Sequence, residues 1–290
     1  MELTPDMVRA AADRIRPHVR RTPVLRCRSL DELAGAQLYM KAENLQRIGA
    51  FKARGAFNAL LQMEADERSR GVLAVSSGNH AQAVALAARE LGTSATVVMP
   101  ADANPAKVAA TLALGADVVS DGVTDANRDE VVAELVRERG LPLVHPYDDL
   151  RVMAGQGTAG LELVSDVQDL DVVVVPVGGG GLISGTAVAV ADASPGTRVV
   201  GVEPEAADDA ARSLRSGSRV RLEATPATVV DGVRAPCVGD RPWAVISRLV
   251  DDIVTVGDDE TLAAMELIWT RAKTVVEPAA AMTLAAVLAG

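Results

Sequence analysis

Four consecutive glycines, Gly178 to Gly181, end a run of β-branched residues in the stretch VVVVPVGGGGLISGT, residues 172–186. Glycine loses more backbone freedom on folding than any other residue, so four in succession need a reason. Exposed backbone N–H groups that lead into a helix N-terminus form an anion site. A tight strand-to-helix turn is the alternative, but it explains four glycines less well. The run therefore predicts a phosphate site.

A second strand-to-helix loop also carries small polar groups. In VSSGNHAQ, residues 75–82, hydrogen-bond donors stand at the start of the next helix, at Ser76, Ser77, Gly78 and Asn79. A loop of this kind suits a carboxylate, and the alternative is a turn in which serine or asparagine caps the helix. We expect a second anion site here, of a size to suit a carboxylate.

Lysine is rare in this chain. The 29 lysines and arginines include only four lysines, which are Lys41, Lys52, Lys107 and Lys273. Lys52 lies in GAFKARGAF beside Phe51, among small apolar residues that could hold a cofactor ring. Lys41 is expected to pair with Glu43, and the other two lysines are expected to be solvated. Because a lysine that burial deprotonates can form a Schiff base, a phosphate site with one desolvated lysine indicates pyridoxal phosphate.

Short apolar segments alternate with alanine-rich helical segments along the chain. Strands are expected at 71–75, 94–100, 116–122, 171–177 and 198–204. Helices are expected at 80–91, 104–115, 125–140, 182–193 and 206–214. The strands are apolar throughout, which is typical of parallel strands covered on both faces. The pattern predicts an α/β fold with doubly wound parallel sheets, in which ligands bind at the carboxyl ends of the strands.

Length and composition restrict the class of protein further. A chain of 290 residues exceeds the size at which one core usually divides, so we expect two domains. The longest apolar runs are only strand-length and the N-terminus lacks an export signal, which argues against a membrane partner. A net charge of −10 and only two residues each of Phe, Tyr and Trp argue against a nucleic-acid partner. Two distant cysteines, Cys27 and Cys237, fit a cytoplasmic protein.

Several longer motifs indicate a protein family. They are KAENLQRIGAFKARGAFNAL, SSGNHAQAVALAA, MPADANPAKVAATLALGADVV, HPYDDLRVMAGQGTAGLEL, VPVGGGGLISG, VEPEAADDA and VVDGV. In order and spacing, from about Thr22 to Ala280, they resemble the serine/threonine dehydratase and serine racemase family of pyridoxal-phosphate enzymes. The resemblance implies two doubly wound parallel-sheet domains with the cofactor in the cleft between them. It places the large domain at 1–67 plus 149–290 and the small domain at 68–148.

The resemblance also implies a role for individual residues. Lys52 would hold the cofactor covalently and then act as the base at the substrate Cα. Ser77 matches the second acid/base, on the opposite face of the substrate, in members that racemise; a carboxylate ligand or a loop cap is its alternative role. The expected cofactor contacts are Phe51, Lys52, Asn79, Gly178, Gly179, Gly180 and Gly181. The expected substrate contacts are Ser76, Ser77, Gly78 and His80.

A divalent cation is a further expectation from the resemblance. In VEPEAADDA, Glu203, the Ala207 carbonyl and Asp209 match family positions that bind Mg²⁺, Mn²⁺ or Ca²⁺ through oxygen. From spacing alone, an acidic and solvated helix start is the alternative. A dinucleotide site would instead assign Glu203 to a ribose, although the glycine run lacks the G-x-G-x-x-G spacing.

The implied activity is β-elimination of L-threonine or L-serine to a 2-oxo acid and ammonia, by a homodimer. Serine racemase is one alternative. A second is a protein of this fold that binds cofactor or amino acid without turnover, because no serine- or threonine-Gly-Gly turn precedes Gly290. In the family that turn supplies the partner of the cofactor's pyridine nitrogen. Thr283 is the last hydroxyl of this chain, and we expect it to pack in a helix rather than reach the ring.

Overall fold

The structure is a computed structural model that describes residues 2–124 and 126–290. The α-helices are α1 (Pro5–Ile15), α2 (Arg28–Ala34), α3 (Lys52–Leu61), α4 (Ala65–Ser69), α5 (Asn79–Glu90), α6 (Pro105–Ala113), α7 (Arg128–Arg139), α8 (Leu150–Asp166), α9 (Gly181–Ala193), α10 (Asp209–Ser216), α11 (Asp240–Leu249), α12 (Asp258–Ala272) and α13 (Pro278–Ala289). The short 3₁₀ helices are η1 (Glu43–Leu45), η2 (Arg47–Gly49), η3 (Glu205–Ala207) and η4 (Asp231–Val233). The strands are β1 (Val24–Leu25), β2 (Met40–Lys41), β3 (Val72–Val75), β4 (Ala95–Val98), β5 (Asp117–Val119), β6 (Val172–Pro176), β7 (Arg198–Pro204) and β8 (Asp252–Val256).

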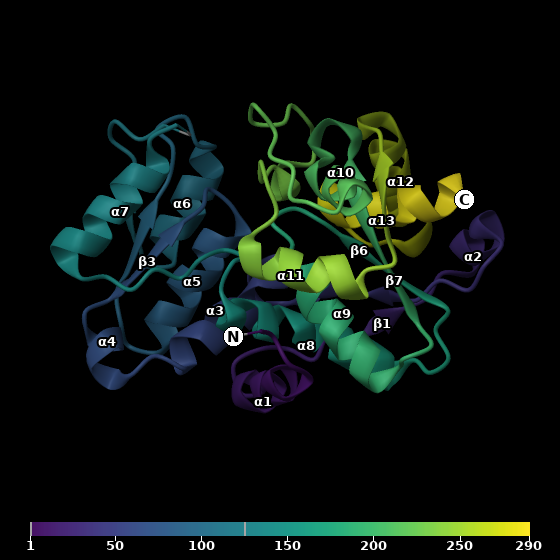
Figure 1. The fold of residues 1–290 in the computed structure, drawn as a ribbon, viewed down its shortest axis with the longest axis horizontal. Helices are drawn as coiled ribbons and strands as arrows, with labels where there is room; N and C mark the ends of the chain where they lie inside the picture. The colour runs from purple at the N-terminus through teal and green to yellow at the C-terminus, as the bar shows by residue number, and fades with distance from the viewer. Residues whose placement is uncertain (1, 125) are drawn as a thin grey trace.

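Two parallel sheets confirm the predicted α/β class. One has the strand order β3-β4-β5 and the other β6-β7-β8, while β1 and β2 form a short antiparallel pair. Figure 1 shows the first sheet in one lobe with α4 to α7, and the second in another lobe with α9 to α13. All four residues of β4 are buried, which explains why its sequence has no polar alternation. The two sheets fall within 68–148 and 149–290, and the domain boundaries themselves stay a prediction.

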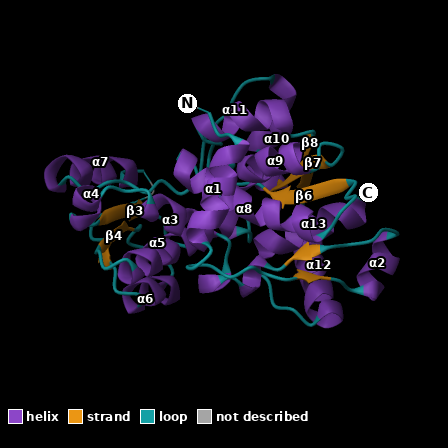
Figure 2. Cartoon of the chain, turned by 90° about the horizontal axis from the view of Figure 1, so that it is seen from below, coloured by secondary structure: helices purple, strands orange, loops and turns teal. Residues whose placement is uncertain are grey.

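Helix α8 lies between the two sheets (Figure 2). Its glycines allow the neighbouring helices to approach closely. A Cβ added to Gly157 would lie 2.6 Å from the carbonyl oxygen of Gly185 in α9. A Cβ added to Gly155 would lie 2.7 Å from Cα of Gly55 in α3. Since packed interiors do not tolerate such overlaps, the stretch AGQGTAG lets α8 hold α3 on one side and α9 on the other.

Helix α3 belongs to the apolar core of the first lobe. Phe57 and Leu60 of α3 pack in one cluster with Val72 of β3 and Val84 of α5. The predicted boundary assigns α3 to the large domain, and its contacts reach both lobes because it also packs on α8. Within residues 2–124 and 126–290, no helix is both long enough and apolar enough to cross a membrane.

Candidate active site

Lys52 is the first residue of α3 and lies at a half-buried position. Its Nζ donates a hydrogen bond to the Pro146 carbonyl oxygen at 2.8 Å and lies 5.3 Å from the centre of the Phe51 ring. Removal of water from the amine lowers the pKa of Lys52 to about 8. At pH 7.5 about a quarter of such an amine is neutral, compared with roughly one in a thousand for an ordinary lysine. Lys52 is therefore able to act as a nucleophile or a base near neutral pH.

The other lysines have different surroundings. Lys41 forms an ion pair with Glu162 at 2.7 Å, so the predicted partner Glu43 is wrong. Lys107 is not simply solvated, because it forms an ion pair with Asp231 of η4. Lys273 is exposed. Lys52, whose pKa burial lowers, therefore stays the candidate for the Schiff base.

The glycine run connects β6 to α9 and packs tightly against the protein. A Cβ on Gly179 would overlap the ring of Tyr147, and one on Gly178 would lie 2.9 Å from Cα of Val233. Gly180 has a φ of +89° and is the N-cap of α9, where no side chain caps the helix. The run thus leaves the first N–H groups of α9 for an anion. Its glycines also have a packing reason that the sequence interpretation had not included.

Residues 144–149, which we call the crossing segment, connect the lobes. His80 of α5 bonds through Nε2 to the Val144 carbonyl oxygen at 2.8 Å, and Lys52 bonds to the Pro146 carbonyl oxygen. The Tyr147 ring covers Gly179, and Asp148 accepts hydrogen bonds from the first N–H groups of α11 at 3.2 and 3.0 Å. The domain boundary that the resemblance implies, between residues 148 and 149, falls within this segment. The sequence did not indicate that the same segment contacts the lysine and the glycine run.

The serine loop lies between β3 and α5. Ser76 Oγ accepts a hydrogen bond from the Gly78 N–H at 3.1 Å, and Gly78 is an N-cap without a side-chain cap for α5. Within the described residues, Ser77 Oγ forms no hydrogen bond. The imidazole of His80 is buried, its Nδ1 has no partner in the described part of the chain, and burial lowers its pKa to about 3. A carboxylate in this loop would therefore meet the backbone N–H groups and Ser77, with a neutral His80 beneath them.

Asn79 contacts a residue that sequence reasoning missed. Its Nδ2 donates to both carboxylate oxygens of Glu277, at 3.1 and 2.8 Å. Glu277 is the N-cap residue of α13, in the other lobe. The only signal in the sequence was VVEP, an acid and a proline at a helix start. This contact and the ion pair between Lys107 and Asp231 connect the first lobe to the second near the serine loop.

The acidic pair Glu203 and Asp209 is buried. Glu203 accepts hydrogen bonds from the N–H groups of Ala210 and Ala211 at 3.0 and 2.8 Å, and Asp209 accepts one from Val238 at 2.9 Å. Burial raises the pKa of Glu203 to about 9 and that of Asp209 to about 7. The described residues contain no group of three or more His, Cys, Asp or Glu side chains suited to a metal. The alternative of a solvated acidic helix start is wrong for these two side chains, because both are at most 1% exposed. A ribose on Glu203 is unsupported for the same reason.

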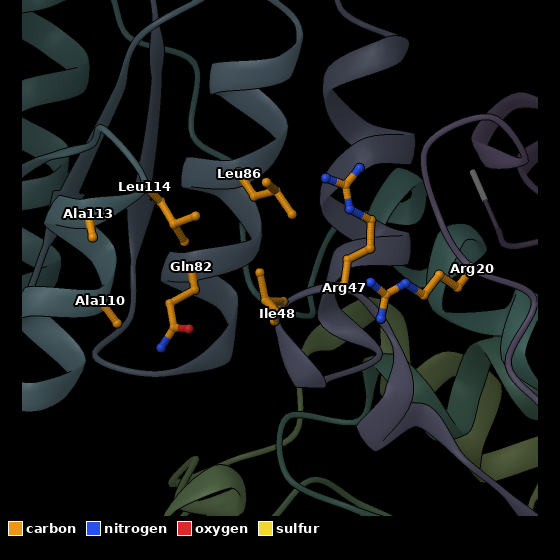
Figure 3. Close-up of a pocket in the computed structure, with 8 residues that line it drawn as sticks. All are labelled: Arg20, Arg47, Ile48, Gln82, Leu86, Ala110, Ala113 and Leu114. Atoms are coloured by element: carbon orange, nitrogen blue, oxygen red, sulfur yellow. The ribbon is translucent and has the colours of Figure 1, made fainter.

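A cavity lies between residues of η2, α5 and α6 (Figure 3). It has a volume of about 460 Å³ and is lined by Arg20, Arg47, Ile48, Gln82, Leu86, Ala110, Ala113 and Leu114. It contains neither Lys52 nor any residue of the glycine run, and of the stretch 75–82 only Gln82 lines it. The candidate active site therefore lies outside this cavity and comprises the lysine, the glycine run, the serine loop and the crossing segment.

The comparison with protein families agrees with this geometry. Residues 15–290 match the family described as pyridoxal-phosphate dependent enzyme. The chain belongs to this family. The residues present fit the cofactor: an amine of lowered pKa and an uncapped helix N-terminus at a glycine run adjoin one segment.

Known proteins similar to this chain include ammonia-lyases and racemases. The chain is 47% identical over 278 residues to L-threo-3-hydroxyaspartate ammonia-lyase of Saccharomyces cerevisiae, covering 96% of this chain and 85% of the relative. It is 44% identical to serine racemase of Arabidopsis thaliana, covering 97% and 84%. The crystal structure of threonine deaminase from T.th. is similar with a TM-score of 0.95 and 51% identity, over 99% of this chain and 92% of that one.

Proposed function

We propose that the chain catalyses pyridoxal-phosphate-dependent β-elimination of L-threonine or L-serine to a 2-oxo acid and ammonia. The observation that carries the proposal is the hydrogen bond from Lys52 Nζ to the Pro146 carbonyl oxygen, beside the Tyr147 ring that covers Gly179. It supports the proposal because it brings an amine of lowered pKa to the segment that packs on the expected phosphate loop.

In this proposal each group has one task. The glycine run and the first N–H groups of α9 bind the cofactor phosphate, and Phe51 packs beside the ring. Asn79 orients the ring from the other side of the cleft. When bound, pyridoxal phosphate supplies an electron sink that acidifies the substrate Cα–H bond. Lys52 Nζ, when neutral, accepts the Cα proton, and the N–H groups at the start of α5 bind the substrate carboxylate.

The names of the similar proteins suggest three candidate substrates. Serine, threonine and 3-hydroxyaspartate each carry a β-hydroxyl group, and the names of the relatives include all three amino acids. Racemisation of serine is the second candidate function. Its support is Ser77, whose hydroxyl forms no hydrogen bond within the described residues and can take or give a proton.

A trapping experiment tests the proposed function. Borohydride reduction of the chain after incubation with pyridoxal phosphate should label Lys52, as detected by peptide mass spectrometry. Lys52→Ala should lose the label and the release of 2-oxo acid from L-serine, L-threonine and L-threo-3-hydroxyaspartate. Lys273→Ala is the matched control because Lys273 is exposed, and it should keep both. A label on another lysine, or 2-oxo acid release by Lys52→Ala, would contradict the proposal. Chiral analysis of the amino acid that remains in the same reactions reports racemisation.

We also propose a divalent cation at Glu203, Asp209 and the Ala207 carbonyl oxygen. The support is a pair of buried carboxylates whose raised pKa values a cation would lower, since oxygen ligands must be ionised. Mg²⁺, Mn²⁺ or Ca²⁺ should raise the melting temperature of the chain, and a chelator should reverse the change. Glu203→Gln should abolish the response. No response of the unaltered chain to any of the three ions would refute this assignment.

A second copy of the chain is the proposed partner. Trp269 and Val275 support it, because they are 64% and 75% exposed at the end of α12 and just after it. Light scattering should give twice the monomer mass, and a monomer at all protein concentrations would rule out the homodimer.

A further inference from the structure

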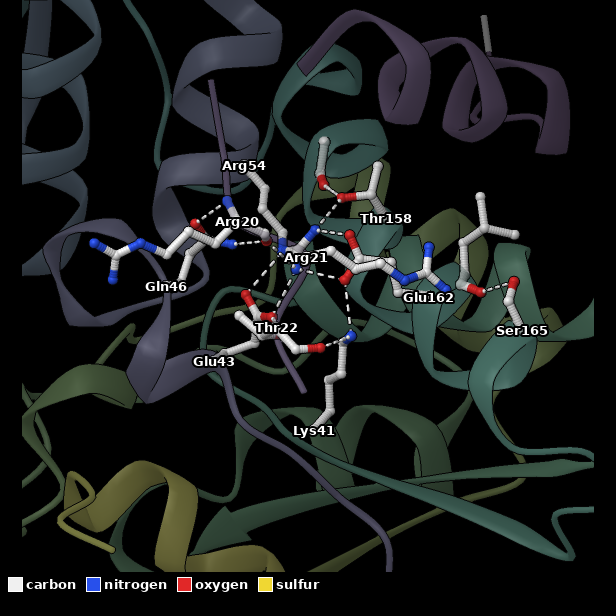
Figure 4. Close-up of polar contacts among 12 residues, drawn as sticks. Arg20, Arg21, Thr22, Lys41, Glu43, Gln46, Arg54, Thr158, Glu162 and Ser165 are labelled. Atoms are coloured by element: carbon white, nitrogen blue, oxygen red, sulfur yellow. Dashed lines mark hydrogen bonds and ion pairs between the residues drawn. The ribbon is translucent and has the colours of Figure 1, made fainter. Parts of the chain in front are cut away.

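Arg54 lies at the centre of a buried ionic network (Figure 4). Its side chain is 0% exposed. Its Nε and Nη2 donate to the two carboxylate oxygens of Glu43, both at 2.8 Å. Its Nη1 and Nη2 donate to the two oxygens of Glu162 at 2.7 and 2.9 Å. One planar guanidinium thus binds two carboxylates, each in bidentate fashion.

The network is balanced in charge. Lys41 also binds Glu162 at 2.7 Å and lies 3.6 Å from Asp166, which pairs with Arg21, so that three basic groups face three carboxylates. The Thr22 hydroxyl donates to Glu43 at 2.5 Å, and its carbonyl oxygen accepts from Lys41 at 2.7 Å. Charges taken out of water are expensive, and a buried ion pair is often no more stable than apolar residues of the same volume. The network is therefore expected to contribute less to stability than to the position of the helices that it joins.

That geometry concerns the position of α3 on α8. Asn58 of α3 bonds to the Arg151 carbonyl oxygen near the start of α8 at 2.6 Å, whereas Arg54 reaches Glu162 farther along, so the helices run in opposite directions. Between these points the side chains of Val152 and Gln156 pack against Gly55, and the Gln156 amide has no hydrogen-bond partner within the described residues. The hydrogen bonds of Asn58 and Arg54 therefore set the position of α3 along α8, and sliding by one residue, about 1.5 Å, would break them. The fork of Arg54 on Glu162 and Glu43 opposes that sliding.

Lys52 begins the same helix two residues before Arg54, and its partner Pro146 lies just before α8. A displacement of α3 along α8 by one residue would separate Lys52 Nζ from the Pro146 carbonyl oxygen. We propose that Arg54 is a positioning residue that fixes the first turn of α3, and with it Lys52, against the crossing segment. The importance of Lys52 rests on the proposed function, whereas the positioning itself does not.

The test measures Lys52 directly and needs no cofactor. Competitive acetylation of the full chain with acetic anhydride, from neutral to alkaline pH, gives the titration midpoint of Lys52 by peptide mass spectrometry. The unaltered chain should give a midpoint near 8. In Arg54→Lys, one ammonium cannot bridge both carboxylates, so the midpoint should move upward by about one pH unit or more. Acetylation does not involve pyridoxal phosphate. The Lys52 midpoint therefore tests the positioning role even if the proposed function is wrong.

Two further variants separate positioning from general destabilisation. Leu60→Ala removes a fully buried side chain of the apolar core from the same helix, six residues after Arg54, so it should lower the melting temperature and leave the Lys52 midpoint unchanged. Glu43→Gln/Arg54→Met/Glu162→Gln removes the charges of Arg54 and its two carboxylates and leaves Lys41 with Asp166, 3.6 Å away. It is the variant to measure if Arg54→Lys does not fold. It should fold and still show the raised midpoint. An unchanged midpoint in a folded Arg54 variant, or an equal shift in Leu60→Ala, would overturn the proposal.

Discussion

Replacement of Gly179 by alanine tests why the glycine run has no side chains. The new Cβ would overlap three atoms of the Tyr147 ring, which is not a flexible chain end that can turn away cheaply. Forced overpacking of this kind destabilises a protein by about 1–3 kcal/mol. For a chain of 290 residues, that corresponds to a melting temperature lower by roughly 2 to 5 °C. Differential scanning calorimetry of the cofactor-free chain measures the change.

A double-mutant cycle assigns the effect to Tyr147. Tyr147→Ala removes the ring, so Gly179→Ala should cost little in that background. The two changes should therefore couple by about 1–3 kcal/mol. Gly196→Ala is the control, because nothing lies within 4 Å of a Cβ at Gly196 and its φ is not positive. If Gly179→Ala is as mild as Gly196→Ala, or if the two effects simply add, the packing argument is wrong.

The same variants separate the two reasons for glycine at this position. Calorimetric titration with pyridoxal phosphate gives the affinity of each variant. If the phosphate lies against the backbone of Gly179, the double variant should recover stability and still bind the cofactor weakly. If the double variant recovers both properties, packing against Tyr147 is the whole reason for Gly179, and the anion contact belongs to other N–H groups.

Three further expectations follow from individual contacts. The pKa of Lys52 is lower in the folded chain than the usual 10.5, so between pH 8 and 10.5 the unfolded chain binds more protons and stability due to this group rises with pH. The melting temperature of Lys52→Met should accordingly exceed that of the unaltered chain most at pH 7, and a constant difference up to pH 10.5 would contradict this. Asn79→Ala and Glu277→Ala should each cost about 0.5–1.5 kcal/mol in urea unfolding, and the double variant no more than either; full additivity would mean that their contact is not formed. Ser77→Ala should reduce elimination from D-serine more than from L-serine, whereas equal losses in the 2-oxo acid assay would make Ser77 a carboxylate ligand.

Much of the fold could be predicted because it follows from local patterns. The strands β3, β4 and β6 fall within the expected ranges 71–75, 94–100 and 171–177, since parallel strands covered on both faces are apolar at every position. The turns after β3 and β6 stood out by their Ser, Asn and Gly residues. Thr283 also lies as expected, because its hydroxyl donates to the Ala280 carbonyl oxygen within α13.

The rest of the site depends on contacts between distant segments. Lys52 and Pro146 are 94 residues apart, and Asn79 and Glu277 are 198 apart. Every residue has a backbone carbonyl group, so the residue types in the sequence could not identify the hydrogen-bond partner of Lys52. Ile48 is a second case: its φ of +58° is rare for a β-branched residue, so the sequence does not predict this turn before Lys52.

The crossing segment explains why these distant groups form one site. It ends at Asp149, whose side chain caps α8, so its position is tied to the helix that also holds α3 and α9. Through Val144 it contacts the first lobe, and through Asp148 it contacts α11 in the second. A movement of either lobe must therefore act on the Pro146 carbonyl oxygen, which holds Lys52, and on the Tyr147 ring, which covers the glycine run. Lys52 and the glycine run are thus held in a fixed position relative to each other, because neither can shift relative to α8 without displacing the crossing segment, which both contact.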